Sequence, residues 1–301
     1  MDADKRCAPG KKYENKSCFS LKSLQEIAKE YNKKHQDKII ITDDKENLVE
    51  QLETKFSKLC STQTCWLETK ILKEIDNNDI HNNTFRPFGP DTKYAWLSTT
   101  HINDVINQYQ TINNNFLFLG TVPYNFLEIP QLGLDNFNFE ENFNKEKYKI
   151  GLVINLDEAH QSGSHWVALY ADLLKNQVYF FDSVGKPPRK KIKKFINKII
   201  DFLYKKYYKS FINVSNIINS INKLGNKEKR QKYFKQFANK LKHFDIRYNH
   251  IQHQFKNSEC GVYSINFLIR LVKNESFDNI INDITKDDRM NECRKVYFNN
   301  T

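Results

Sequence analysis

Four polar residues of this sequence have the types that nucleophilic catalysis at a carbonyl group requires: His165, Asp182, Gln254 and Cys260. A cysteine attacks a carbonyl carbon as its thiolate, an imidazole takes the proton and returns it to the leaving group, and a carboxylate orients the imidazole. The backbone N–H of Cys260 and the side-chain amide of Gln254 can donate hydrogen bonds to the resulting oxyanion. A cysteine in an apolar helix is by itself more commonly an inert core thiol, so the prediction depends on all four residues together.

The sequence around Cys260 predicts that this cysteine begins a helix. It follows Ser258-Glu259 and precedes a strongly apolar stripe at helical spacing from Val262 to Val272. Because the first turn of a helix carries partial positive charge, it favours a thiolate at that position.

The other two catalytic candidates stand at the ends of predicted strands. His165 opens the run WVALYADL and Asp182 closes the run QVYFF, with Lys175-Asn176 as a turn between the two runs. If these strands pair as an antiparallel hairpin, their outer ends meet, which makes His165 and Asp182 neighbours. His160, His250 and His253 are alternatives for the base, but none opens a strand that ends beside a carboxylate, and each fits a surface or loop position better.

The six cysteines, at positions 7, 18, 60, 65, 260 and 293, are too few and too scattered for a disulfide scaffold. We therefore expect reduced thiols. A four-thiolate zinc site made of Cys7, Cys18, Cys60 and Cys65 is an alternative, but its spacings of ten and four intervening residues are unusual for a structural zinc site. The sequence predicts no metal site and no cofactor.

Residues 1–85 have the pattern of a small helical arm. One apolar helical stripe follows Ser20, a second follows Asp43-Asp44, and the β-branched run 39–42 forms an extended link between them. The segment FRPFGP, ending at Pro90, interrupts any regular structure and marks a boundary, so the core is predicted to cover residues 86–301.

The core has an α+β pattern. A helical stripe runs from Ile102 to Tyr109 and ends before a loop around Gly120 and Pro123. The runs IGLVINL, WVALYADL and QVYFF predict three strands, and residues 245–254 predict a fourth. Two amphipathic helical stretches, at 192–203 and 217–244, separate the third and fourth strands.

Basic residues gather in one segment. Residues 186–242 contain 18 Lys and Arg against two acids, Asp201 and Glu228, whereas the whole chain carries a net charge of +11. This segment, taken as a basic helical insertion at 186–243, is either a solvated helical face or a surface for DNA or another polyanion. No segment has the ~20 apolar residues that cross a bilayer, and the N-terminus lacks the apolar run of a secretory signal, so a cytosolic type of compartment is expected.

The order of the site residues resembles that of the adenain and Ulp1-like cysteine protease family. His165-Trp166, Asp182-Ser183, Gln254 and Cys260-Gly261 follow one another with a His-to-Asp interval of 17 and a Gln-to-Cys interval of 6, as in that family. The resemblance covers roughly residues 94–301. It implies a papain-related α+β core, with a central mixed sheet flanked by helices and the nucleophile at a helix N-terminus.

An upstream segment extends the resemblance. Trp96-Leu97, followed by residues 102–106, is similar to the family's Trp-Leu-Asn-Asp segment, although Ser98-Thr99 stand where Asn-Asp is usual. In the family, this tryptophan and the one after the catalytic histidine wall a narrow tunnel that admits only Gly-Gly. The resemblance therefore gives Trp96 and Trp166 a substrate-binding role.

The phrase SGSHWVALYADL and the helical arm look most like the maturation proteases of large cytoplasmic DNA viruses, the asfarvirus type included. This resemblance implies cleavage at Gly-Gly-X sites of viral structural polyproteins, in the host cytoplasm at sites of virus assembly and in the virion. Two alternatives stay open. One is a protease that removes SUMO or ubiquitin-like proteins, and the other is a nucleic-acid-bound scaffold that uses the basic segment.

Overall fold

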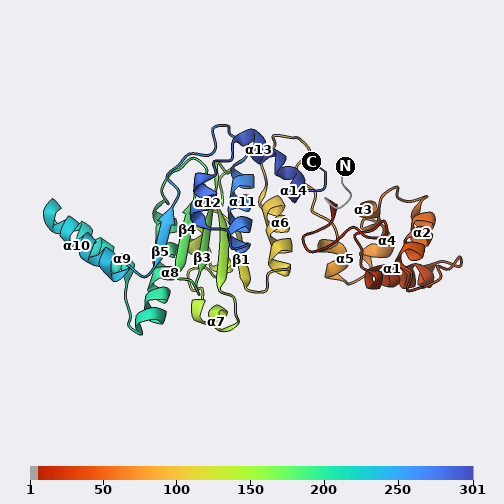
Figure 1. The fold of residues 1–301 in the computed structure, drawn as a ribbon, viewed down its shortest axis with the longest axis horizontal. Helices are drawn as coiled ribbons and strands as arrows, with labels where there is room; N and C mark the ends of the chain where they lie inside the picture. Colours follow the sequence, from red (N-terminus) through yellow and green to blue (C-terminus); the bar gives the residue numbers. More distant parts are fainter. Residues whose placement is uncertain (1–5, 301) are drawn as a thin grey trace. The chain divides into compact units, whose positions relative to one another are not determined.

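The computed structural model describes residues 6–300, which form two compact units (Figure 1). One unit ends at Thr92 and also contains the chain from Arg294 onward, and the other spans Lys93 to Cys293. The predicted boundary at 85/86 therefore lies inside the first unit, and the C-terminal segment was assigned to the wrong unit. The reason is pairing between segments that are far apart in the sequence: Asn299 N–H donates to Pro87 O at 3.0 Å, and Gly89 N–H donates to the Asn300 side chain at 2.6 Å.

The first unit is helical, as predicted. Its two main helices are α1 (Leu21–Lys34) and α2 (Lys45–Phe56), whose first turns are capped by the side chains of Ser20 and Asp44. Residues 39–42 connect them without pairing in a sheet. The unit is completed by the short helices α3 (Gln63–Trp66), α4 (Lys70–Lys73), α5 (Asn78–Asn82) and α14 (Arg294–Tyr297).

The expectation of reduced cysteines is wrong for the first unit. Cys7 forms a disulfide with Cys18 and Cys60 forms one with Cys65, with Cα–Cα distances of 5.4 and 5.7 Å. Cys7 and Cys18 are buried in the core of this unit, where the fold brings their segments together around Phe19 and Phe85. Spacing along the chain does not reveal this proximity. Because these four sulfur atoms are bonded in pairs, they do not make the four-thiolate zinc site considered above.

The second unit contains a five-stranded mixed sheet, so the predicted α+β class is confirmed. Its strands lie in the order β1 (Phe116–Val122), β2 (Lys149–Asn155), β3 (Trp166–Asp172), β4 (Gln177–Phe181) and β5 (Asp245–Tyr248). The two edge pairs, β1–β2 and β4–β5, are parallel, whereas β2–β3 and β3–β4 are antiparallel. The three central strands match the predicted runs.

The edge strands differ from the prediction. β5 ends at Tyr248, although the prediction extended it to 254, and β1 was not predicted. The reason for the second error is Gly120, which has a φ of 97° and lies where the β1–β2 register shifts. A glycine of this kind suggests a turn in the sequence, but here it forms an irregularity within a paired strand.

Helices cover both faces of the sheet. Alternate residues of β2, β3 and β4 share one core cluster with α8 (Lys190–Tyr208), which contributes six buried apolar side chains. The other face packs against α11 (Cys260–Val272). On this face Phe181 stacks on Phe267, and Gly151 lies so near Leu268 that a Cβ at position 151 would be 3.5 Å from that side chain. The remaining elements are α6 (Thr99–Thr111), η2 (Phe126–Glu128), η3 (Pro130–Leu132), α7 (Phe139–Asn144), α12 (Phe277–Asn282) and α13 (Asp287–Glu292).

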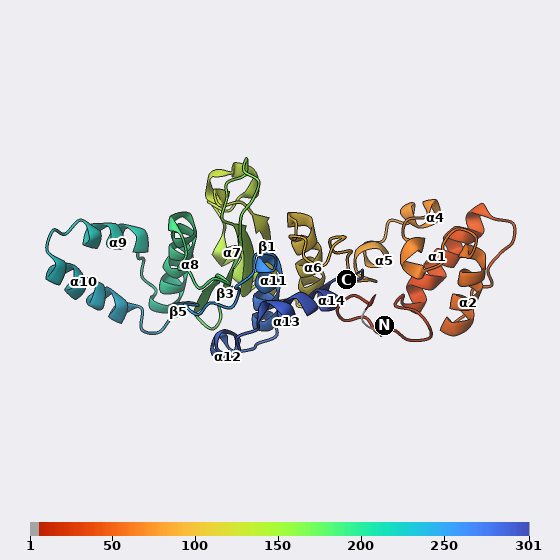
Figure 2. The same cartoon turned by 90° about the horizontal axis from the view of Figure 1, so that it is seen from above.

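The basic segment is not a single insertion. α8 belongs to the core of the sheet, and the predicted helix 217–244 is in fact two helices, α9 (Val214–Asn222) and α10 (Lys227–Lys240), separated by a break around Gly225. The part that extends away from the sheet beyond β5 is α9–α10 alone (Figure 2). No helix among residues 6–300 is long and apolar enough to cross a membrane.

Candidate active site

The β3–β4 hairpin brings His165 and Asp182 together. The two strands pair in antiparallel register from Ala168–Phe181 to Asp172–Gln177. Continued by one residue pair, this register puts Asp182 opposite Val167, so His165 lies two residues further along, on the diagonal where long side chains still meet. The Nε2–H of His165 donates to Oδ1 of Asp182 at 2.7 Å. The adjacency expected from the strand ends is therefore confirmed.

Cys260 completes this group. It is the first residue of α11, as predicted, and it is 2% exposed. Burial of the His165 ring opposes its protonation, but hydrogen bonds with Asp182 and Cys260, together with the negative charges of both, raise the pKa of His165 to about 9. The imidazole thus lies between a carboxylate and a thiol, and its protonated form is stabilised at neutral pH. Such a pair supplies a thiolate for attack and a proton for the leaving group.

Asp182 is fixed by Asn249, which the sequence did not single out. The Asn249 side chain accepts from the Asp182 N–H at 2.8 Å and donates to the Asp182 carbonyl at 2.7 Å. Oδ1 of the carboxylate also accepts from the Val184 N–H at 3.0 Å. Asn249 is fully buried just after β5, and neither its spacing nor its type distinguishes it from the many other asparagines of this chain.

Gln254 is buried and its carboxamide is oriented by Ser183. The Ser183 hydroxyl donates to Oε1 of Gln254 at 2.6 Å, while the Ser183 carbonyl accepts from the Gln254 N–H at 2.9 Å. With its oxygen occupied, the carboxamide retains its NH₂ group as a donor for another acceptor. This orientation is the one that an oxyanion donor requires. The pair Asp182-Ser183 therefore positions two of the four candidates.

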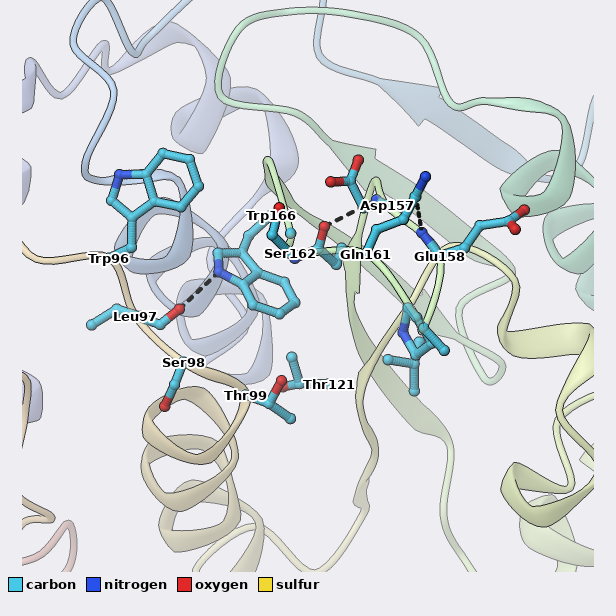
Figure 3. Close-up of a pocket in the computed structure, with 15 residues that line it drawn as sticks. Trp96, Leu97, Ser98, Thr99, Thr121, Asp157, Glu158, Gln161, Ser162 and Trp166 are labelled. Atoms are coloured by element: carbon cyan, nitrogen blue, oxygen red, sulfur yellow. Dashed lines mark hydrogen bonds between the residues drawn. The ribbon is translucent and has the colours of Figure 1, made fainter.

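Gly261 lets the Trp96-Leu97 segment approach the nucleophile. A Cβ at position 261 would lie 3.0 Å from Cβ of Leu97, closer than side chains normally pack. The carbonyl of Leu97 accepts from Nε1–H of Trp166 at 2.9 Å (Figure 3). Leu97 thus connects the residue after Cys260 with the residue after His165.

The two tryptophans line one cavity of about 540 Å³ (Figure 3). Trp166 is 8% exposed, whereas Trp96 is 46% exposed. The lining of this cavity is mixed and also includes the polar residues Thr121, Asp157 and Gln161. None of the four catalytic candidates is among the lining residues. The cavity adjoins them through Leu97, which lines it and packs against Gly261 beside the nucleophile.

The other histidines do not take part in this arrangement. His160 and His250 are exposed in loops. His253 is buried: its Nε2 lies 3.1 Å from the Ile281 carbonyl, its ring packs edge-on against Phe181, and burial lowers its pKa. The described residues contain no group of three or more His, Cys, Asp or Glu that could hold a metal ion.

The fold and the Cys-His-Asp geometry define a class: this chain is a cysteine protease. The model of the Ulp1 protease family, C-terminal catalytic domain, matches residues 96–300, so the chain belongs to that family. A protein of Acanthamoeba polyphaga mimivirus that is named as a thiol protease is 33% identical over 306 residues, which cover 95% of this chain and 90% of the relative.

Solved structures show the same fold. A crystal structure of the ASFV (African swine fever virus) protease aligns over 99% of this chain and 97% of its own, with a TM-score of 0.61 and 16% identity. Its selenomethionine form gives a TM-score of 0.59 and 18% identity over the same shares. Because the aligned part covers nearly all of this chain, the structural similarity includes the helical arm as well as the protease core.

Proposed function

We propose that this protein is an endopeptidase that cleaves after Gly-Gly in viral structural polyproteins. The observation that carries the proposal is the position of His165, which is hydrogen-bonded to Asp182 at 2.7 Å and lies near enough to Cys260 for that residue to help raise its pKa. We assign Cys260 as nucleophile, His165 as acid and base, Asp182 as the group that orients His165, and Gln254 as a donor to the oxyanion.

The reaction follows from these positions. The Cys260 thiolate attacks the scissile carbonyl carbon, and Gln254 together with the Cys260 N–H stabilises the oxyanion. Collapse of this intermediate breaks the C–N bond, the His165 imidazolium protonates the leaving amine, and a thioester remains on Cys260. Neutral His165 then takes a proton from water, whose oxygen attacks the thioester and releases the free carboxylate and the thiolate.

The preference for Gly-Gly rests on the two tryptophans. Trp96 and Trp166 line the same cavity, and the hydrogen bond from Trp166 to Leu97 holds their segments together. We infer that the two indoles wall the path of the substrate as a slot, so that any side chain larger than hydrogen at the two positions before the cut would contact an indole. The viral relative and the shared fold support a viral precursor as substrate, processed in the host cytoplasm and in the virion during maturation.

A matched peptide set tests the proposal. Purified protein is incubated with a Gly-Gly-X peptide and with versions in which one glycine is alanine, and products are identified by mass spectrometry. We expect cleavage after the second glycine, a loss of about 10- to 200-fold in kcat/KM for each added methyl group, and no turnover by Cys260→Ala. Turnover that survives Cys260→Ala, or that tolerates alanine, contradicts the assignment.

A SUMO or ubiquitin-like substrate is distinguished in the same assay. A SUMO precursor carries Gly-Gly within a folded partner, so it tests for a protein-binding surface in addition to the slot. Cleavage of the precursor far faster than of the peptide would identify a deconjugating protease. Comparable rates, together with Gly-Gly directly before the new N-termini of virion proteins, would support polyprotein processing.

A further inference from the structure

Helix α10 differs from the other long helices of the protease unit because it buries no residue. It is attached to the core by two partly buried residues, Phe237 and Leu241, with Ile218 of α9 packing beside the same cluster. Figure 2 shows α9 and α10 extending away from the sheet beyond β5. A helix that is polar on nearly all sides gains little stability from packing, so its surface is available to a partner.

The structure separates two kinds of lysine within the basic segment. Lysines of α8 face acids: Lys191 pairs with Glu128 and Glu158 at 2.8 and 2.7 Å, and Lys198 and Lys205 pair with Asp135 and Glu140 at 2.9 and 2.7 Å. These pairs balance much of the charge of α8.

The lysines of α10 have no such neighbours. Lys229, Lys232 and Lys235 are exposed, recur every three residues on one face of the helix, and take part in none of the ion pairs found among residues 6–300. Glu228 is the acidic residue of this helix. Six cations that take part in no ion pair among residues 6–300 therefore lie on α10 beside the single acid of that helix, although other unpaired cations remain in the range 186–243.

Exposed aromatic rings accompany these cations. Phe211, in the loop between α8 and α9, is 84% exposed, and Lys205 Nζ lies 5.4 Å from its ring centroid. Tyr207 on α8 and Tyr233 on α10 are 45% and 49% exposed. Single exposed aromatics are ordinary, but rings interspersed with unpaired lysines are the combination that binds unstacked bases and their phosphates.

We propose that α9–α10 and the Phe211 loop bind single-stranded nucleic acid. Lysines alone would suit an acidic protein or a duplex equally well. The exposed rings favour a single strand, because only unpaired bases present their faces for stacking. This binding is separate from peptide hydrolysis and does not require it.

Fluorescence anisotropy with a labelled oligo(dT) of 20 nucleotides tests the lysines, using the full-length chain at several salt concentrations. The variant Lys229→Gln/Lys232→Gln/Lys235→Gln removes three exposed, unpaired cations. Its matched control, Lys191→Gln/Lys194→Gln/Lys198→Gln, removes three cations of α8 that lie beside acids. Each lost phosphate contact should reduce the slope of log K against log salt by about 0.7, so the first variant should lose a slope of about 2 and bind about 100-fold more weakly at 0.1 M salt.

Phe211→Ala tests stacking independently of charge. We expect affinity to fall about 5- to 100-fold with the salt slope unchanged, because a ring releases no counterions. Thermal melting of each variant establishes that it is folded.

Any of the following results would overturn the proposal: equal losses for the α10 variant and the α8 control, no effect of Phe211→Ala, or competition by poly-glutamate as effective as that by unlabelled oligo(dT). The last outcome would identify the surface as one for acidic polypeptides. Tighter binding of a duplex than of the single strand would likewise contradict the stacking argument.

Discussion

Replacement of Asp182 by asparagine should lower the pKa of His165 while leaving the geometry of the hairpin end intact. Oδ1 of Asp182 accepts from both His165 and the Val184 N–H, and an asparagine retains that oxygen but loses the negative charge. The perturbation therefore isolates charge from hydrogen bonding.

The magnitude follows from the pKa of His165, which rises from an ordinary value of 6.5 to about 9. At ~1.4 kcal/mol per pH unit, the charged ring is favoured by about 3 kcal/mol in the folded protein. Burial of the ring opposes this rise. The hydrogen bond to Asp182 is the largest of the interactions that raise the pKa, Cys260 contributes next, and the charge of Asp182 adds to both. Loss of the carboxylate charge should consequently lower the pKa by about one pH unit or more.

The raised pKa also links pH to stability. Because the pKa of His165 is higher in the folded chain than in the unfolded chain, its stabilising contribution is complete below pH 6.5 and is lost as the pH rises through about 9. Wild-type protein should lose up to about 3 kcal/mol from this source across that window. The Asp182→Asn variant should lose less stability over the same pH range, because the pKa of its His165 is raised less.

Two assays read the effect. An NMR titration of the His165 ring resonances gives its pKa without any substrate, and the pH profile of kcat/KM gives the alkaline limb, which requires the protonated imidazole. Both should move to lower pH in Asp182→Asn. The control, Asp172→Asn, changes the same charge at the other end of the hairpin, where Oδ1 accepts from the Leu174 and Lys175 N–H groups. An unchanged His165 titration in Asp182→Asn would refute the electrostatic reasoning.

Three further predictions concern residues that support the site or the arm. Asn249→Ala removes three hydrogen bonds of a buried side chain, so urea unfolding should show that the free energy of unfolding falls by about 3 kcal/mol. The kcat should also fall, because Asp182 is no longer held in place. An unchanged kcat would count against this role of Asn249. Gly261→Ala should force Leu97 aside and raise KM for a Gly-Gly peptide more than it lowers stability, which kinetics and melting together measure. Cys7→Ser should destabilise the arm unit by about 2–3 kcal/mol, seen as earlier proteolysis of that unit, with peptide hydrolysis retained.

The site could be located from the sequence because its geometry follows from local rules. Strand ends place His165 beside Asp182, and an apolar helical stripe places Cys260 at a helix N-terminus. Asn249 could not be found in this way, since its role depends on a strand that ends earlier than its apolar pattern suggests. The same limit applies to Ser183, whose hydroxyl meets Gln254 across 71 residues of sequence.

Elements of the fold could be predicted where the apolar pattern of the sequence is strong. They could not be predicted where contacts between distant segments determine the structure. The three central strands follow continuous apolar runs of strand length, and the first two helices follow apolar patterns of period 3.6. Strand β1 was missed because Gly120 interrupts it, and α8 was assigned to an insertion because its many lysines obscured a core face. The disulfides depend on contacts between loops of the arm, which no short-range pattern encodes.

The pairing of Asn299 and Asn300 with the segment at Pro87–Gly89 has a consequence for biosynthesis. A ribosome delivers the arm first, but the piece that closes it emerges only after the whole of residues 93–293 has been made. The arm unit therefore remains incomplete while residues 93–293 of the protease unit are being synthesised. Deletion of the segment from Arg294 onward should accordingly destabilise the arm unit, and the arm unit should complete its folding after the unit that follows it in the chain.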